Sequence, residues 1–227
     1  MTAPYWSGDG VTLYLGDCRE VDEWLAADVL VTDPPYGIAN RSGGPRYNKG
    51  VFYTSPNVSV HGDRDTTVSD SALAAWGDRP AVVFGTWKAV RPAGTRNRLI
   101  WFKHGTNPGM GPGTPWSPAE EEIYILGGGF HGPRTLNVIT TYETRCGPGG
   151  LAGRIGHPTP KPVPLMQALI RCCMDGVVAD PFAGSGSTLV AAKLEGRQAV
   201  GVEMDERYCE IAARRLDQGV LDFGDPA

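Results

Sequence analysis

The sequence predicts an α/β protein with a doubly wound, mostly parallel sheet that includes one antiparallel strand. Two short apolar runs, at 29–31 and 177–179, are each followed within two residues by an Asp and then by a turn rich in Pro or Gly, which is typical of parallel strands. The second turn leads into a helical stretch and another apolar run at 198–203. Runs at 98–103 and 122–126, joined by a segment rich in Gly and Pro, predict an antiparallel pair that finishes the sheet.

Length and composition indicate one ordinary domain. With 227 residues, 41% of them hydrophobic, residues 1–227 are expected to fold as a single unit around one core. No apolar run approaches the roughly 20 residues that span a bilayer, and the first residues lack the basic-then-apolar pattern of a signal peptide. The odd number of five cysteines favours a reducing compartment. We therefore expect a cytoplasmic protein with no membrane partner.

The tetrapeptide Asp33-Pro34-Pro35-Tyr36, one residue after the first apolar run, has the composition of a pocket for an amino group on a flat ring. An ionised Asp only accepts hydrogen bonds, and prolines remove backbone N–H donors. An NH2 group offers one hydrogen to the Asp33 carboxylate and one to the Pro34 carbonyl, while Tyr36 can stack on the ring. Taken alone, the same tetrapeptide is also an ordinary turn.

The later turn predicts a nucleoside site. Residues 177–188 form a buried strand, a Gly-rich turn and the start of a helix that ends at Gly196. The strand at 198–203 ends in Glu203, 19 positions after the first glycine of the turn, and an acid there can accept both hydroxyls of a ribose. The third glycine of the dinucleotide fingerprint is replaced by Leu189, which disfavours pyrophosphate.

Both motifs resemble the signatures of DNA amino-methyltransferases that use S-adenosylmethionine. The tetrapeptide resembles their catalytic motif, and Phe182-Ala183-Gly184-Ser185-Gly186 resembles their cofactor motif. Because the catalytic motif comes first, the chain is similar to the circularly permuted subgroup called beta, which methylates adenine N6 or cytosine N4. The segments 13–18, 157–162 and 205–208 match the family in the same order and frame most of the chain.

The resemblance implies a role for each matched residue. Asp180 would take the methionine ammonium and Glu203 the ribose, while Thr159 and Lys161 would face the methionine carboxylate. Asp17 would lie near the adenine ring. The full assignment is catalytic Asp33, Pro34, Pro35 and Tyr36, and cofactor-binding Asp17, Cys18, Thr159, Lys161, Asp180, Phe182, Ala183, Gly184, Ser185, Gly186, Ser187, Thr188 and Glu203.

Some of these residue types have simpler interpretations. Without the family context, Asp17 would cap a helix over 18–26, and Asp205 is expected only to cap the last helix. Cys172-Cys173 lie in an apolar helical stretch that begins at Val163, which favours packing over redox or metal chemistry. No Cys-x-x-Cys pair occurs and the four histidines never recur at zinc spacing, so we expect no metal.

The charge distribution favours a nucleic-acid partner more than the net charge of −4 does. Residues 38–162 carry 14 Lys and Arg against 8 Asp and Glu, a net of +6, whereas 1–37 and 163–227 are net −6 and −4. If the two ends build the pocket, the positive middle would contact DNA. An ordinary solvated surface is the simpler interpretation.

Residues 38–75 and 104–156 are the candidate DNA-contacting loops or insertions. The segment 37–61 has few aliphatic residues and predicts a long loop, which either closes over a flipped base or is a plain surface loop. A helix is expected at 69–76, within the first candidate, and a strand at 81–85 after it. Side chains available for stacking or for phosphate and guanine contacts are Tyr47, Phe52, Arg134, Arg145 and Arg154.

The expected reaction is direct methyl transfer from S-adenosylmethionine to the exocyclic N6 of an adenine flipped out of double-stranded DNA. The Asp at position 33 favours adenine as the target base, because serine is frequent at that position in the members of the family that methylate cytosine. Methylation of cytosine N4 is the alternative. A non-catalytic cofactor- or DNA-binding module and an RNA or protein methyltransferase are further alternatives. The resemblance is compatible with a homodimer and with a restriction-modification system.

Overall fold

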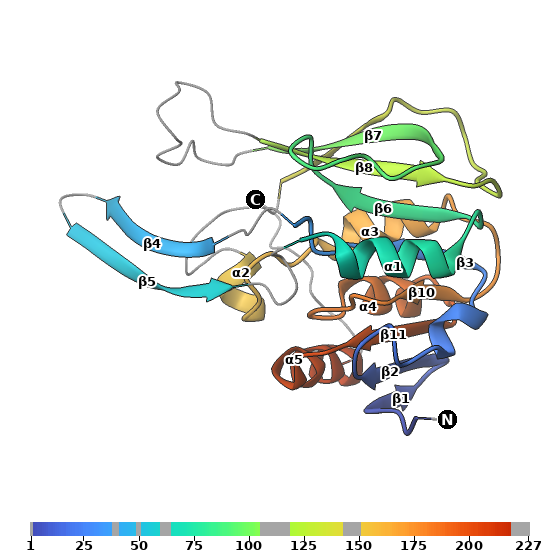
Figure 1. The fold of residues 1–227 in the computed structure, drawn as a ribbon, viewed down its shortest axis with the longest axis horizontal. Helices are drawn as coiled ribbons and strands as arrows, with labels where there is room; N and C mark the ends of the chain where they lie inside the picture. Colours follow the sequence, from blue (N-terminus) through green and yellow to red (C-terminus); the bar gives the residue numbers. More distant parts are fainter. Residues whose placement is uncertain are drawn as a thin grey trace.

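The computed structural model describes residues 2–37, 41–48, 51–59, 65–104, 119–142 and 151–218. A nine-stranded sheet forms its centre, in the order β1-β2-β11-β10-β3-β6-β8-β7-β9 (Figure 1). The strands of this sheet are β1 (Trp6–Gly8), β2 (Val11–Leu15), β3 (Val29–Thr32), β6 (Ala81–Gly85), β7 (Thr95–Lys103), β8 (Glu120–Leu126), β9 (Val138–Thr141), β10 (Val178–Asp180) and β11 (Ala199–Glu203).

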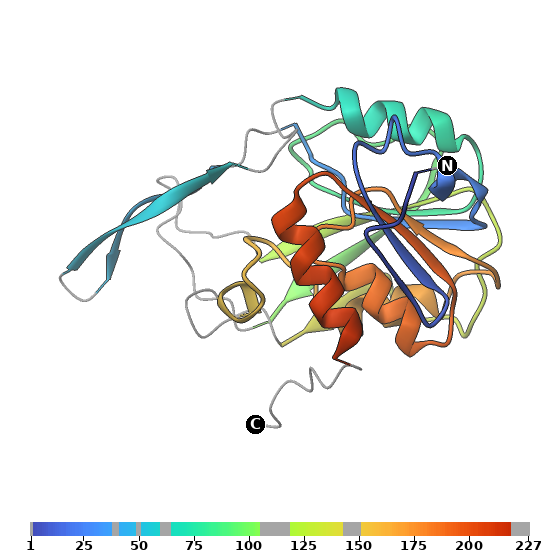
Figure 2. The same ribbon diagram turned by 90° about the horizontal axis from the view of Figure 1, so that it is seen from below.

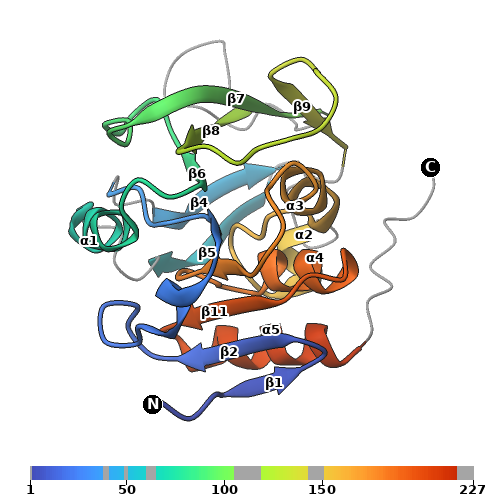
Figure 3. The same cartoon turned by 90° about the vertical axis from the view of Figure 1, so that its right-hand side faces the viewer.

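Helices cover both faces of the sheet, so the predicted α/β architecture is confirmed (Figure 3). The helix α1 (Thr67–Trp76) and the 3₁₀ helix η1 (Glu23–Ala26) pack on one face. The other face is covered by α3 (Val163–Ile170), α4 (Ser187–Leu194) and α5 (Glu206–Asp217), and a short helix α2 (Leu151–Ile155) precedes α3.

The central strands β2, β11, β10, β3 and β6 are parallel, as expected. The predicted pair β7 and β8 is antiparallel, but β8 inserts between β6 and β7 and is antiparallel to both. The sheet does not finish there, because β9 pairs in parallel with β7. A second antiparallel strand, β1, pairs with β2 at the other edge, so the expectation of one antiparallel strand was too low. Both unpredicted edge strands are only three or four residues long.

Successive residues of the parallel strands enter two different cores. Val29 and Val31 face the helices α3 to α5, whereas Leu30 faces Trp24 and α1. This alternation explains why the run at 29–31 is apolar throughout, since a parallel strand is buried on both faces. The tetrapeptide at 33–36 therefore follows directly from a fully buried strand.

Leu189 of α4 is fully buried against β11, where a Cβ at Gly201 would lie 2.7 Å from its Cδ1. Replacing Leu189 with alanine would open a cavity and is expected to lower the free energy of unfolding by about 2–5 kcal/mol. Denaturant titration measures this loss. Leu194 on the same helix is 43% exposed, and Leu194→Ala is expected to cost less than about 1 kcal/mol. Equal losses in the two variants would contradict the packing described here.

The segment predicted as a long loop after the tetrapeptide is instead mostly a β-hairpin. Its strands β4 (Arg41–Asn48) and β5 (Val51–Ser59) pair antiparallel and project from the body of the molecule (Figure 2). Hydrogen bonds of a β-ladder join backbone groups and need no aliphatic side chains, so the composition of this segment did not reveal the hairpin. The side chains of Tyr47 and Phe52 lie outside the described part of the structure.

No helix spans 18–26 either. The Asp17 carboxylate accepts a hydrogen bond from the backbone N–H of Arg19 at 2.9 Å, and the chain makes a turn before the short helix η1. Asp17 therefore caps a turn rather than a helix. The expected cap at Asp205 is confirmed, since its side chain accepts from the Arg207 N–H at 3.0 Å.

Within the described ranges, no helix is both long and apolar enough to cross a membrane.

Candidate active site

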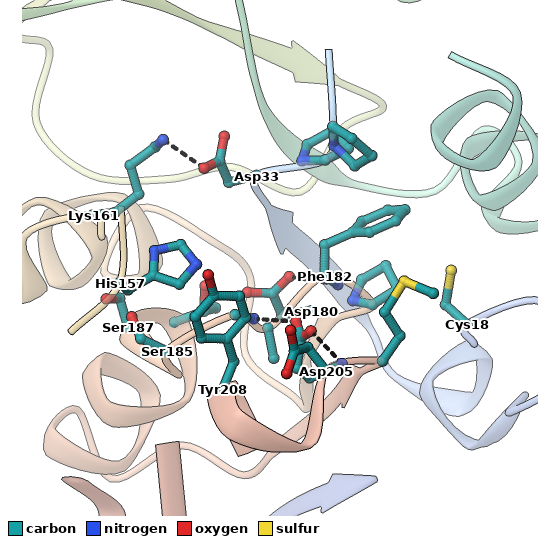
Figure 4. A pocket seen from close by; sticks show the side chains of 18 of the residues that line it. Cys18, Asp33, His157, Lys161, Asp180, Phe182, Ser185, Ser187, Asp205 and Tyr208 are labelled. Carbon is teal, nitrogen blue, oxygen red and sulfur yellow. Dashed lines mark hydrogen bonds and ion pairs between the residues drawn. The ribbon is translucent and has the colours of Figure 1, made fainter. Parts of the chain in front are cut away.

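A pocket of about 340 Å³ opens at the carboxyl ends of the central strands (Figure 4). Every residue assigned from the sequence lines it except Gly186. Gly186 begins α4 with a φ of 80°, and a Cβ there would lie 2.8 Å from the Ala212 Cβ. The absence of a side chain at position 186 therefore allows α4 and α5 to approach each other closely.

The two motifs meet because their strands are neighbours. β3 and β10 are parallel, with Val29 opposite Val178, so the loops that leave them share one edge of the sheet. Thr32 at the end of β3 donates a hydrogen bond from Oγ1 to Asp180 Oδ1 at 2.7 Å. This contact joins the end of β3 directly to the end of β10 across 148 positions of sequence.

Asp33 is held at both carboxylate oxygens. Tyr36 donates from its hydroxyl to Oδ1 at 2.5 Å, and Lys161 Nζ lies 2.5 Å from Oδ2 (Figure 4). Burial raises the pKa of Asp33, although the charge of Lys161 opposes that rise. Burial and the neighbouring Asp33 carboxylate raise the pKa of Tyr36 well above its ordinary value, so the phenol stays neutral and donates. The Asp33 side chain keeps 26% of its surface exposed and lines the pocket.

Lys161 contacts the Asp33 carboxylate, whereas the resemblance implied that it faces the methionine carboxylate of the cofactor. Its Nζ pairs with Asp33 and also with Glu121 Oε2 at 3.1 Å, and its side chain is 7% exposed. Glu121, at the start of β8, was not identified from the sequence. No local motif marks it, because its position beside Asp33 depends on the insertion of β8 next to β6.

Glu203 connects the glycine loop to the start of α5. Its Oε2 accepts from the Gly184 N–H and its Oε1 from the Asp205 N–H, both at 2.8 Å. Each carboxylate oxygen has a further lone pair available for a ligand hydroxyl. Burial raises the pKa of Glu203, against the effect of these backbone hydrogen bonds.

Asp180 is a buried carboxyl group at the base of the pocket. In addition to Thr32, the Phe182 N–H donates to its Oδ1 at 3.1 Å. Burial raises the pKa of Asp180 to about 7. A cation placed beside it would favour the ionised form, so the site suits a ligand ammonium group.

The far end of the pocket is formed by Asp17 and Cys18. Hydrogen bonds from Arg19 lower the pKa of Asp17, whose carboxylate pairs with the Arg19 guanidinium at 2.5 Å. Cys18 is buried, and burial raises the pKa of its thiol to about 11. The thiol is therefore a neutral, packed group at neutral pH.

His157 and Tyr208 form a wall of the pocket that the sequence did not assign. Their ring centroids lie 4.4 Å apart (Figure 4), and a Cβ at Gly184 would meet His157 Nε2 at 3.2 Å. Burial, with the charge of Lys161, lowers the pKa of His157 to about 4, so the ring is neutral. His157 opens the segment 157–162, which the motif comparison already marked.

The four cysteines in the described part of the chain, Cys18, Cys172, Cys173 and Cys209, are free thiols. Cys173 is buried in the core, in line with the predicted packing role, whereas Cys172 is exposed, and both follow the end of α3 at Ile170. Among the described residues, no cluster of three or more His, Cys, Asp and Glu side chains is arranged to hold a metal ion.

The DNA methylase family of the N6/N4 type matches residues 141–214 of this chain. The type II methyltransferase M2.LlaDCHI of Lactococcus lactis subsp. cremoris is 38% identical over 260 aligned positions, which cover 96% of this chain and 94% of the relative.

Two solved structures share the fold. The M1.HpyAVI-SAM complex aligns with a TM-score of 0.60 at 19% identity, over 90% of this chain and 99% of its own. The PvuII DNA methyltransferase, described as cytosine-N4-specific, aligns with a TM-score of 0.63 at 16% identity, over 99% of this chain and 91% of its own. The near full-length relative, together with the family match, shows that the chain belongs to the N6/N4 DNA methylase family.

Proposed function

We propose that this protein transfers a methyl group from S-adenosylmethionine to the exocyclic N6 of adenine at specific sites in double-stranded DNA. The order of its motifs would place it in the permuted beta subgroup. The observation that carries the proposal is the shared pocket, in which Asp33 after β3 faces the glycine loop after β10. A carboxylate suited to an amine and a loop suited to a nucleoside thus lie within one cavity.

The residues present fit S-adenosylmethionine. Asp180 would face the ammonium of its methionine portion, and Glu203 would accept the ribose hydroxyls with the lone pairs left by its two backbone contacts. Asp17 would lie near the adenine ring. When bound, the cofactor supplies an electrophilic methyl group on a sulfonium.

Asp33 and Pro34 would orient the target amine. The Asp33 carboxylate accepts one hydrogen and the Pro34 carbonyl the other, which draws the nitrogen lone pair out of conjugation and toward the methyl carbon. With the cofactor bound, a new N–C bond would replace the C–S bond of the sulfonium, the thioether would leave, and the methylated nitrogen would give up a proton. Asp33, already a hydrogen-bond acceptor from that nitrogen, is the nearest group to receive it.

Glu203→Ala is expected to weaken S-adenosylmethionine binding by about 10- to 100-fold, since hydrogen bonds to a charged group contribute about 1.5–3 kcal/mol. Calorimetric titration of the purified protein measures the affinity. Glu210, on the helix α5 that follows β11, is exposed and its carboxylate lies 3.7 Å from Arg214, so Glu210→Ala is the matched control. Unchanged affinity in Glu203→Ala would remove the ribose assignment.

Adenine is preferred over cytosine because Asp stands at position 33, where serine is frequent in the cytosine group. Both bases present the same exocyclic amine, and the structural relative PvuII is itself described as cytosine-N4-specific. Cytosine N4 methylation is therefore the second candidate function. Methylated nucleosides released from the DNA product distinguish the two.

The DNA path is proposed to run over the segments 38–75 and 104–156. The hairpin β4–β5 and α2 lie on the side where β3, β10 and β11 end (Figure 1). Arg154 of α2 is exposed there and is available for phosphates. Arg134 is exposed as well, but it lies between β8 and β9 at the opposite edge of the sheet, where His131 donates to the carbonyl of Cys172 before β10. Arg145 and the loop at 105–118 lie outside the described residues. A second copy of the chain as partner is part of the same proposal.

The acceptor class is tested by offering labelled S-adenosylmethionine with unmethylated duplex DNA, RNA or protein as alternative acceptors. The proposal predicts label in duplex DNA and background counts in the other two. Label confined to RNA or protein would overturn the DNA substrate, and cofactor binding without transfer to any acceptor would favour a binding module.

A further inference from the structure

Four charged side chains form a continuous network beside the pocket. Lys161 Nζ lies 2.5 Å from Asp33 Oδ2 and 3.1 Å from Glu121 Oε2, and Glu121 Oε1 pairs in turn with Lys103. Tyr36 extends the network through its hydrogen bond to Asp33. These residues come from the end of β3, the start of β8, the end of β7 and the segment before α3. Two carboxylates and two ammonium groups balance, so the network carries no net charge.

The charges in this network are fixed by one another. Burial alone would lower the pKa of Lys161, but the Asp33 and Glu121 carboxylates raise it above its ordinary value. Burial would raise the pKa of Glu121, but the charges of Lys161 and Lys103 hold it below the usual range. Among the described residues, two further titratable groups face the network. His157 faces Lys161, whose charge helps to lower the pKa of His157, and the buried Asp180 faces Asp33.

We propose that Glu121 is a positioning residue, which holds Lys161 against Asp33 so that Lys161 keeps the Asp33 carboxylate ionised and aimed at the target amine. The inference rests on the proposed function, because it assigns a role to the group that receives that amine. It also places the antiparallel strand β8 in the active site, through a residue whose proposed effect on Asp33 passes through Lys161.

Lys161 needs a second anchor for physical reasons. A lysine side chain is a flexible point charge, and ordering it costs up to about 2 kcal/mol of conformational entropy. With Asp33 as its sole anionic partner, its position would change whenever Asp33 turned toward an incoming amine. Glu121 contacts the same ammonium through its Oε2, and the ring centroid of Phe84 lies 4.9 Å from Nζ. Lys161 can then stay in place while Asp33 uses its remaining lone pairs for substrate.

Glu121→Gln removes the second anchor with almost no change in shape. We expect kcat for DNA methylation to fall by about 10- to 100-fold, with the KM for S-adenosylmethionine unchanged. The acid limb of the pH profile should move to higher pH, because Lys161 no longer holds Asp33 in its ionised form. A Glu121 that acted merely as a nearby negative charge would give the opposite shift, since removing a like charge favours ionised Asp33.

A double-mutant cycle tests whether Glu121 acts through Lys161. In the background of Lys161→Met, Glu121→Gln should have no further effect on kcat, whereas independent effects would multiply and overturn the inference. Glu120→Gln, an exposed neighbour on the same strand, is the control and should match wild type. If Glu121→Gln unfolds, Glu121→Asp keeps the charge but shortens the reach, and should still lower kcat.

Different results would contradict the proposed function and the role of Glu121. A wild-type protein without methylation of DNA would contradict the proposed function itself. An active wild type in which Glu121→Gln behaves like Glu120→Gln, or shifts the acid limb to lower pH, would leave the function in place and refute the role of Glu121.

Discussion

Replacement of Asp33 by alanine is expected to lower the rate of methyl transfer by at least about 10²- to 10³-fold, which is the usual loss when a group that stabilises developing charge is removed from an active site. The variant would lack the acceptor that, with Pro34, orients the amine. Binding of S-adenosylmethionine should be retained, because Asp180 and Glu203 lie on other strands of the sheet. Single-turnover transfer of a labelled methyl group to DNA, combined with calorimetry of cofactor binding, measures the two effects separately.

Asp78→Ala is the matched control for this experiment. Asp78 is exposed and precedes β6, at the edge of the sheet opposite the pocket, so the same change there should leave the rate at the wild-type value. Asp33→Asn separates charge from shape, and should be nearly as slow as Asp33→Ala because an amide would present a donor to Lys161. Turnover by Asp33→Ala at the wild-type rate would refute Asp33 as the catalytic acceptor.

Replacement of Asp180 by asparagine is expected to change stability and cofactor binding in opposite directions. Burial raises the pKa of Asp180 from 3.8 to about 7, so the folded protein binds this proton more tightly than the unfolded chain does. The cost of ionising the buried group therefore grows as pH rises from about 4 to 7 and is complete above that range. Asp180→Asn should raise the free energy of unfolding of the cofactor-free protein at pH 8, by at most about 4 kcal/mol.

The same substitution removes the proposed partner of the methionine ammonium. Affinity for S-adenosylmethionine should fall by about 10- to 100-fold, and added cofactor should stabilise the wild type far more than the variant. Thermal denaturation at pH 4 and pH 8, with and without cofactor, measures all of these differences. A variant that is less stable at pH 8 would show that the hydrogen bonds from Thr32 and Phe182 outweigh the cost of the buried charge.

The parts of the fold that could be predicted are those with a strong local pattern. The run Val29–Thr32 is buried on both faces, and the alternation of strand, glycine turn and helix around Asp180 is continuous in sequence. The hairpin β4–β5 and the edge strands β1 and β9 escaped prediction, because their pairing is made by backbone groups and gives little apolar periodicity. The helix expected after Asp17 was wrong because the side chain of Asp17 folds onto Arg19 and stabilises a turn.

The residues of the site fall into the same two groups, those marked by a local pattern and those that depend on pairing across the sheet. Asp33 and Glu203 each follow directly from a strand and its loop, and the structure brings them into one pocket. Glu121 could not be found, since nothing near it in the sequence shows that β8 runs antiparallel beside β6. The pairing of Lys161 with Asp33 spans 128 positions and joins the segment before α3 to the end of β3, so no local pattern shows it either. Interactions made across the sheet therefore required the structure, whereas those made along one loop did not.

The most direct test of the account is the identity of the methylated nucleoside. Purified protein would be incubated with isotopically labelled S-adenosylmethionine and unmethylated duplex DNA, which is then digested to nucleosides and analysed by mass spectrometry. The account predicts labelled N6-methyldeoxyadenosine that is absent from the Asp33→Ala reaction. Labelled N4-methyldeoxycytidine would keep the mechanism and replace the base, and a DNA digest with no methylated amino group would contradict the central claim.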